Sequence, residues 1–284
     1  MKSAYQLIKY PFILFYILTT FSCSDWEQSV SLPVSEKPTS GRVVLLEDFT
    51  GTSCPNCPAG SAEVEKLLEK YPSNLVVMGI HSNFLAVPVK AGDPNLRNAD
   101  AQAIEKFLGN WLGKPEASIN RKLFSPGASN IRIGKPDTWN SFVDRELALP
   151  PEIELNISNS FDATTRMLKT TLTATAKKII TEAVHLHVAI TESKIVADQK
   201  DNRIPSGVIE NYVLQHALRK LLTDVKGDRI ADSMSEGEKI VKEYTFVLPT
   251  DAVLWVAENC SVVAFVSQDE IKKYVYQAAE AKVK

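Results

Sequence analysis

Residues 47–58 read Glu-Asp-Phe-Thr-Gly-Thr-Ser-Cys-Pro-Asn-Cys-Pro and directly follow the apolar run 43–46. Two of the four cysteines, Cys54 and Cys57, fall in this stretch. Two thiols separated by two residues can close a small disulfide ring and reopen it by exchange. Pro55 suits the first position of a helix, where no backbone N–H is needed, so we expect a helix to begin at the cysteines. The stretch therefore predicts a redox turn between a strand and a helix.

Each side chain of this turn has an expected role. A helix N-terminus lowers the pKa of a thiol placed on it, which makes Cys54 the candidate nucleophile and Cys57 the thiol that resolves a mixed disulfide. Asp48 is a candidate proton acceptor for Cys57 through water. Two other interpretations stay open: a disulfide that only staples the turn, and a metal site that uses both thiolates with His81 nearby. A histidine at a strand end is more often a core or rim residue.

Working outward, strands and helices alternate along residues 42–149. Apolar runs predict buried strands, and apolar residues at helical spacing predict amphipathic helices. Their order is β-α-β-α-β-β-α, which begins with a right-handed crossover. The expected elements are strand 42–49, a helix that ends near Tyr71, strand 74–81, helix 99–112, strands 116–124 and 130–134, and helix 136–149.

This order, together with the cysteine pair, resembles the thioredoxin fold. In that fold a buried carboxylate lies beneath the disulfide, where this chain has Asp48, and a cis-proline faces the disulfide, where it has Pro115. Ser53 and Lys114 depart from the pattern, because thioredoxins commonly have tryptophan and an apolar residue or threonine at these places. A lysine near the turn would favour the thiolate of Cys54. The resemblance implies catalytic roles for Cys54, Cys57, Asp48 and Pro115.

From residue 150 to 284 the pattern changes to alternation with period two, which is typical of antiparallel strands. We expect an all-β antiparallel, immunoglobulin-like sandwich. The segment 208–222 fits a strand or a helix, and its context favours a strand. His185 and His187 lie on the alternate face of strand 184–190; we interpret that face as solvated, with metal binding as the minor alternative. Cys260 is expected to be a buried free thiol.

The N-terminus predicts export. Lys2 and Lys9 precede the apolar run 11–18, which is too short to span a bilayer and has the form of a secretory signal. Residues 1–22 are expected to be a lipoprotein-type signal peptide, with Cys23 as the lipidated first residue. An ordinary signal or an uncleaved anchor is the alternative. The polar segment 23–41 reads as a flexible tether between the membrane and the folded part.

The charge balance says little about partners. The chain has 32 basic and 34 acidic residues among 284, so no global charge favours nucleic acid. No phosphate-binding loop or further nucleophile motif is present, and no cofactor is expected.

The whole mature chain resembles the twenty-eight-kilodalton outer-membrane protein family of Gram-negative bacteria. The residues that carry this resemblance are the motifs 46–51, 57–59, 79–81, 119–121, 263–266 and 276–279. The resemblance implies an outer-membrane lipoprotein of the cell envelope that faces the periplasm or the cell surface. Envelope protein thiols or disulfides would be its partners if the pair is catalytic. The alternatives are a binding lipoprotein with a structural disulfide and a tethered metallochaperone.

Overall fold

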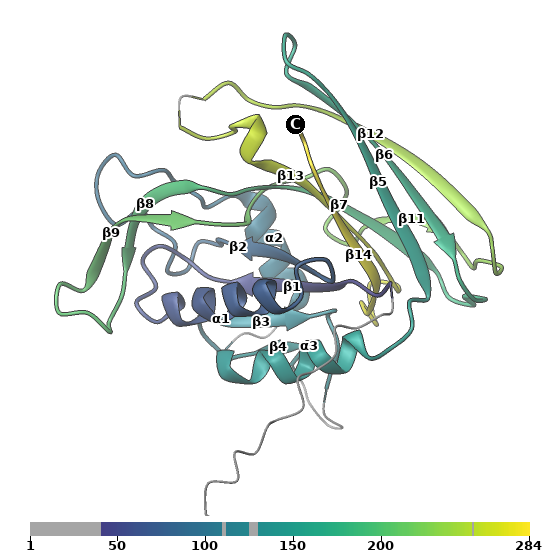
Figure 1. Ribbon diagram of the computed structural model, residues 1–284, viewed down its shortest axis with the longest axis horizontal. Helices are drawn as coiled ribbons and strands as arrows, with labels where there is room; N and C mark the ends of the chain where they lie inside the picture. Colours follow the sequence, from purple (N-terminus) through teal and green to yellow (C-terminus); the bar gives the residue numbers. More distant parts are fainter. Residues whose placement is uncertain (1–40, 110–111, 125–129, 252) are drawn as a thin grey trace, which may run out of the picture. The chain divides into compact units, whose positions relative to one another are not determined.

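The computed structural model describes residues 41–109, 112–124, 130–251 and 253–284, and Figure 1 shows their arrangement. The predicted signal peptide, the lipidation site Cys23 and the tether up to residue 40 lie outside the described residues. Among the residues that are described, no helix is both long enough and apolar enough to cross a bilayer.

The first half of the described chain follows the predicted order of strands and helices. Its helices are shorter than expected, because α2 ends at Leu108, just before Gly109 with positive φ, and α3 begins only after a short 3-10 turn at Pro136. The elements are β1 (Val44–Phe49), α1 (Cys57–Lys70), β2 (Leu75–Ile80), α2 (Ala99–Leu108), β3 (Glu116–Ile119), β4 (Arg132–Ile133), η1 (Pro136–Thr138) and α3 (Trp139–Leu147).

Helices cover both faces of this part of the sheet. β1 lies between β2, with which it pairs in parallel, and β3, with which it pairs antiparallel. As in any strand, its alternate residues point to opposite faces of the sheet. Val44 and Leu46 pack with α1 and α3 in one apolar cluster, whereas Leu45 and Phe49 pack with α2 in another. Every residue of β1 is buried, which explains its continuous apolar run.

The second half is built almost entirely of strands. A three-stranded sheet, β12-β6-β5, packs its apolar face on one face of β7 and β13, and the cluster between them includes Leu168, Leu172, Val188 and Val262. The elements are β5 (Ile153–Asp162), β6 (Met167–Ala176), β7 (Val184–Glu192), β8 (Ile195–Lys200), β9 (Val208–Leu214), β10 (Ala217–Leu221), β11 (Asp228–Ala231), β12 (Lys239–Val247), η2 (Ala257–Asn259), β13 (Cys260–Ser267) and β14 (Val275–Lys282).

One continuous sheet joins the two halves across the expected boundary at residue 149. Its strand order is β14-β13-β7-β10-β2-β1-β3-β4, so strands of both halves are hydrogen-bonded neighbours. The junction is β10 with β2, where Ala217 pairs with Gly79 and the Gly79 N–H donates to the His216 carbonyl over 2.8 Å. The chain is therefore a mixed α/β structure with a large β-sheet content, in which a single sheet serves both halves.

Two interpretations of the second half were wrong. His187 does not face solvent: it is 2 % exposed, its ring stacks on Phe265 at 4.3 Å between centroids, and Nε2 lies 2.9 Å from Ser267 Oγ. Both faces of β7 are covered, one by the three-stranded sheet and the other by the cluster that contains α2. The segment 208–222 forms strands and no helix, as expected, but it is not a single strand, because it breaks at Gln215 and His216 into β9 and β10.

β7, β8, β9 and β10 form one long antiparallel ribbon with a break in the middle. Ala217 pairs with Glu192 in the stem and Ile195 pairs with Leu214 beyond the break, so the register continues unchanged. At the break Lys194 and His216 have positive φ. Side chains replace the ladder there: Gln215 Oε1 accepts from Lys194 N and Ser193 Oγ accepts from His216 N. The outer part, residues 195–214, is called the β8–β9 arm below; Figure 1 shows it diverging from the main sheet.

Candidate functional site

Cys54 and Cys57 form a disulfide in the turn between β1 and α1. The helix begins at Cys57, two residues later than the sequence suggested, and the proline of its first turn is Pro58 instead of Pro55. Cys54 therefore lies in the turn before the helix, where its carbonyl accepts from Cys57 N over 3.3 Å. Cys57 is the first helical residue, and Cys54 lies three residues before it, beside the helix N-terminus.

Pro115 lies against the first turns of α1. The Lys114–Pro115 peptide bond is cis, as the resemblance implied. A β-carbon built on Gly60, three residues after Cys57, would lie 2.9 Å from Pro115 Cβ. Glycine at position 60 thus permits the close approach of the proline loop to the helix that carries the cysteine pair.

Asp48 is a buried carboxyl group at the end of β1. It is 5 % exposed, and burial raises its pKa to about 7, an effect that the charge of Lys114 partly offsets. Asp48 and His81 line a small cavity of about 50 Å³ between α1, β2 and β9. Asp48 Oδ1 and His81 Nε2 have no hydrogen-bond partner among the described residues. A cavity of this size with two polar partners accommodates water. The carboxyl group of Asp48 can therefore exchange protons near neutral pH.

His81 is a buried neutral histidine. It is 1 % exposed, and burial, together with the charge of Lys114, lowers its pKa to about 3. Its Nδ1 atom lies 3.4 Å from the Gly79 carbonyl oxygen. Among the residues that the structure describes, no three His, Cys, Asp or Glu side chains are grouped so that they could hold a metal ion.

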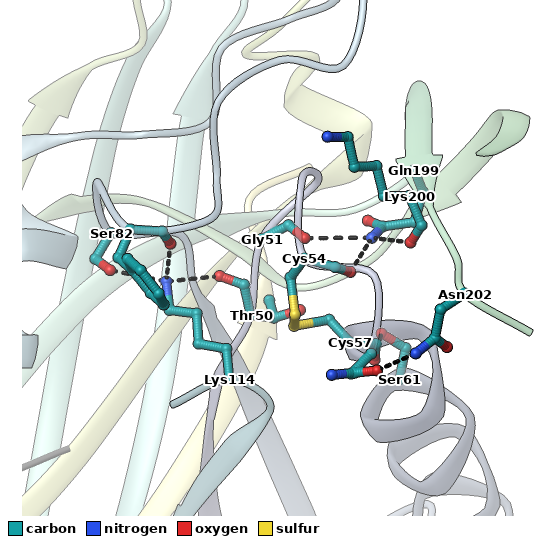
Figure 2. The surroundings of a disulfide bond; sticks show 12 residues. Thr50, Gly51, Cys54, Cys57, Ser61, Ser82, Lys114, Gln199, Lys200 and Asn202 are labelled. Atoms are coloured by element: carbon teal, nitrogen blue, oxygen red, sulfur yellow. Dashed lines mark hydrogen bonds between the residues drawn. A yellow bond between two sulfur atoms is a disulfide. The ribbon is translucent and has the colours of Figure 1, made fainter. Parts of the chain in front are cut away.

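Lys114 fastens two loops beside the turn. Its Nζ donates to the carbonyls of Thr50 and Phe84, at 2.9 and 2.8 Å, and to Ser82 Oγ at 2.8 Å. Figure 2 shows the ammonium group directed at Thr50 and Ser82. Burial lowers its pKa to about 8. The residue that departs from the thioredoxin pattern thus joins the loop after β1 to the loop after β2.

The β8–β9 arm covers the disulfide turn. The Gln199 side-chain Nε2 donates to the carbonyls of Cys54 at 3.0 Å and Gly51 at 3.2 Å (Figure 2). The backbone N–H of Lys200 donates to the Thr52 carbonyl over 2.9 Å. Cys54 is 0 % and Cys57 is 1 % exposed. No sequence signal placed the arm here, because Gln199 and Cys54 are 145 residues apart.

The motif 119–121 is structural. Asn120 Oδ1 accepts from Leu45 N, its carbonyl accepts from Val275 N, and its Nδ2 donates to Glu146. Arg121 forms a buried ion pair with Glu47, with Nη2 2.7 Å from Oε1. These contacts tie β1 to α3 and β14. Cys260 is a buried free thiol, and burial raises its pKa to about 12.

The chain matches the profile of a known protein family. The profile of the family described as outer membrane protein Omp28 matches residues 102–284, well over half of the chain. The chain belongs to the Omp28 family. Membership supports a location in the cell envelope, at the outer membrane. Within this member of the Omp28 family, Pro115 and the arm lie in the matched range, whereas Asp48, Cys54 and Cys57 precede it.

Solved structures share the fold of this Omp28 family member at low sequence identity. HBP35 of Porphyromonas gingivalis has a TM-score of 0.65 and 19 % identity, with 87 % of this chain and 77 % of that chain covered. A protein of Agrobacterium tumefaciens has a TM-score of 0.52 and 13 % identity, with 86 % of this chain and 96 % of that chain covered. No curated protein sequence gives a significant match.

Proposed function

We propose that this Omp28 family protein is an exported lipoprotein, anchored through Cys23, whose thioredoxin-like part exchanges thiols and disulfides with envelope proteins at Cys54 and Cys57. The part after residue 150 is an immunoglobulin-like sandwich in this proposal. Three observations support it: a disulfide between Cys54 and Cys57 in the turn after β1, a cis-proline packed against Gly60 of the helix that follows, and a buried carboxyl group in β1 whose pKa is raised to about 7.

The proposed reaction balances within the pair and its substrate. In the reduced protein the Cys54 thiolate attacks a substrate disulfide, which forms a mixed disulfide and releases one substrate thiolate. The Cys57 thiol passes its proton toward Asp48 through water, and its thiolate attacks the Cys54 sulfur. The products are the Cys54–Cys57 disulfide and the second substrate thiolate, so two electrons pass to the substrate. Each step is reversible, and the oxidised pair can accept two electrons from an envelope dithiol.

A second candidate function rests on burial. Because Cys54 and Cys57 are at most 1 % exposed, the disulfide also suits a staple in a binding lipoprotein. The two functions differ in redox potential. Structural disulfides have potentials below about −300 mV, whereas exchanging pairs lie above this value.

The test is a redox titration of the purified full-length protein in glutathione and dithiothreitol buffers, followed by exchange with a polypeptide disulfide. We expect a potential above about −300 mV, which is the range of exchanging pairs. Cys57→Ser should trap a mixed disulfide, Cys54→Ser should trap none, and Cys260→Ser should behave as the wild type because its thiol is buried. A lower potential and a Cys54→Ser variant as active as the wild type would establish the staple.

A further inference from the structure

The tip of the arm contacts the disulfide turn through backbone hydrogen bonds. The N–H groups of Lys200 and Asn202 donate to the carbonyls of Thr52 and Pro55, at 2.9 and 3.0 Å. Lys200 is the last residue of β8, and Asn202 lies in the turn that follows it. The arm therefore meets the disulfide turn through its main chain.

Gln199 sets the position of this segment. It is 2 % exposed, and its Nε2 lies within 3.2 Å of the carbonyl oxygens of Gly51, Cys54 and Lys200. A side-chain amide supplies two N–H donors, which three acceptors surround here. A carboxylate in place of this amide would meet no hydrogen-bond donor among these neighbours, because all three are acceptors.

An irregularity in the ladder lies beside Gln199. The register of β8 with β9 shifts between Ala197 and Gln199: Asp198 of β8 lies opposite both Glu210 and Asn211, so the extra residue is in β9. Asp198 accepts from Asn211 N at 3.1 Å and from Lys90 Nζ at 3.2 Å, so its own bonds hold the irregularity in place.

A thiolate that attacks a disulfide must reach sulfur along the S–S axis, and neither cysteine of this pair is exposed. Residues 199–202 pack on the turn through N–H donors that match its carbonyls. Any polypeptide substrate that uses these carbonyls competes with residues 199–202 for them.

We propose that residues 199–202 are an internal pseudosubstrate. They occupy the place in which a polypeptide segment, with two main-chain N–H groups two residues apart, is bound beside Cys54–Cys57 for exchange. This inference rests on the proposed function and names its substrate class: polypeptide segments, in preference to small thiols. Exchange requires the arm tip to leave the turn.

The first experiment tests whether the tip guards the pair. Gln199→Glu keeps the shape of the side chain and directs a carboxylate at three carbonyl oxygens. We expect the full-length variant to be reduced by excess dithiothreitol at least about tenfold faster than the wild type, because two or more hydrogen bonds of about 1 kcal/mol each are lost. The trapped thiols are counted by mass. Gln215→Glu is the matched control, since Gln215 only accepts from Lys194 N; it should keep the wild-type rate.

Gln199→Ala removes the same donors without adding charge, and should give a smaller increase in rate if Gln199→Glu does not fold. Equal reduction rates in the wild type and in a folded Gln199 variant would overturn the inference.

The second experiment tests the substrate class. A synthetic peptide of residues 196–203 should slow the reduction of the Gln199→Glu protein, and the same peptide with glutamate in place of its glutamine should have less effect. No slowing by the first peptide would overturn the assignment of a polypeptide site.

The two proposals fail differently. If Gln199→Glu is reduced quickly and protected by the peptide but exchanges with no polypeptide disulfide, the proposed function is wrong and the pair is a guarded staple. If the wild-type protein exchanges with polypeptide disulfides at the rate of Gln199→Glu, the proposed function stands and the pseudosubstrate is wrong.

Discussion

Gly60 and Pro115 pack so closely that a β-carbon on Gly60 would lie 2.9 Å from Cβ of Pro115. The same β-carbon would lie 3.1 Å from Cη2 of Trp139. Trp139 is fully buried and has no free space into which it can withdraw, whereas Pro115 is partly exposed. The spacing between α1 and the proline loop therefore depends on the absence of a side chain at one position.

Gly60→Ala should lower the free energy of unfolding by about 1–2 kcal/mol, because overpacking outweighs the gain in helix propensity. It should also change the reduction rate of the cysteine pair, since the proline loop must shift. Denaturant unfolding measures the first effect. Gly113→Ala is the control, because a β-carbon there meets nothing within 4 Å. Stability equal to that of the control would show that the loop yields freely.

Lys114→Met should lower the free energy of unfolding by about 2–4 kcal/mol, because it removes a charged donor from three oxygen acceptors near the turn. Proteolysis within loop 82–98 should also become faster. Lys106→Met, at an exposed position of α2, is the comparison and should change stability by less than about 0.5 kcal/mol. A Lys114→Met protein as stable as Lys106→Met would contradict the role assigned to the ammonium group.

Asp48→Asn should make stability less dependent on pH. The folded state holds the Asp48 proton up to a pKa of about 7, whereas the unfolded chain releases it near 3.8. The folded state thus binds the additional proton, and its stability is full below pH 4 and falls as pH rises to 7. The variant should therefore exceed the wild type above pH 7 by at most about 4 kcal/mol, and match it near pH 4.

Unfolding curves at pH 4 and pH 8 provide the measurement for Asp48. Asp137→Asn, at an exposed site, should show the same difference from the wild type at both values. A constant offset for Asp48→Asn across this range would show that the carboxyl group does not titrate in it.

Glu47→Gln should lower the free energy of unfolding by about 3–5 kcal/mol, because it leaves the guanidinium of Arg121 buried without its counter-charge. The double variant Glu47→Leu with Arg121→Met should recover part of the loss. Glu63→Gln, which breaks the exposed pair with Lys66, should cost less than about 1 kcal/mol. Thermal unfolding compares the three, and equal losses for Glu47→Gln and Glu63→Gln would refute the assigned burial.

Local patterns predicted the parts of the site that depend on neighbouring residues. Three features depend only on residues close together in the sequence: the strand before the turn, the cysteine spacing and the proline before β3. All three are found where expected. The carbonyl partners of Lys114 and the contact of Gln199 with Cys54 depend on segments brought together by the sheet. No periodicity records such a contact.

The alternation of β7 predicted one buried face correctly and misassigned the other. Polar residues such as His187 at alternate positions normally indicate solvent, but here Phe265 and the cluster around α2 cover that face. Because one sheet continues from the first half into the second, β7 acquires a second buried face that its own sequence does not require.

The break at Lys194 and His216 divides the long ribbon into a stem that is fixed in the main sheet and an arm that can change direction. Its stem is clamped in the main sheet through the pairs of β7 with β10, while its outer half reaches the cysteine turn. Two non-glycine residues with positive φ set the angle between stem and arm, and each such conformation costs roughly 1 kcal/mol. The direction of the arm is thus encoded at two backbone positions, so a change at either one re-aims the tip without unpairing a single bond of the stem.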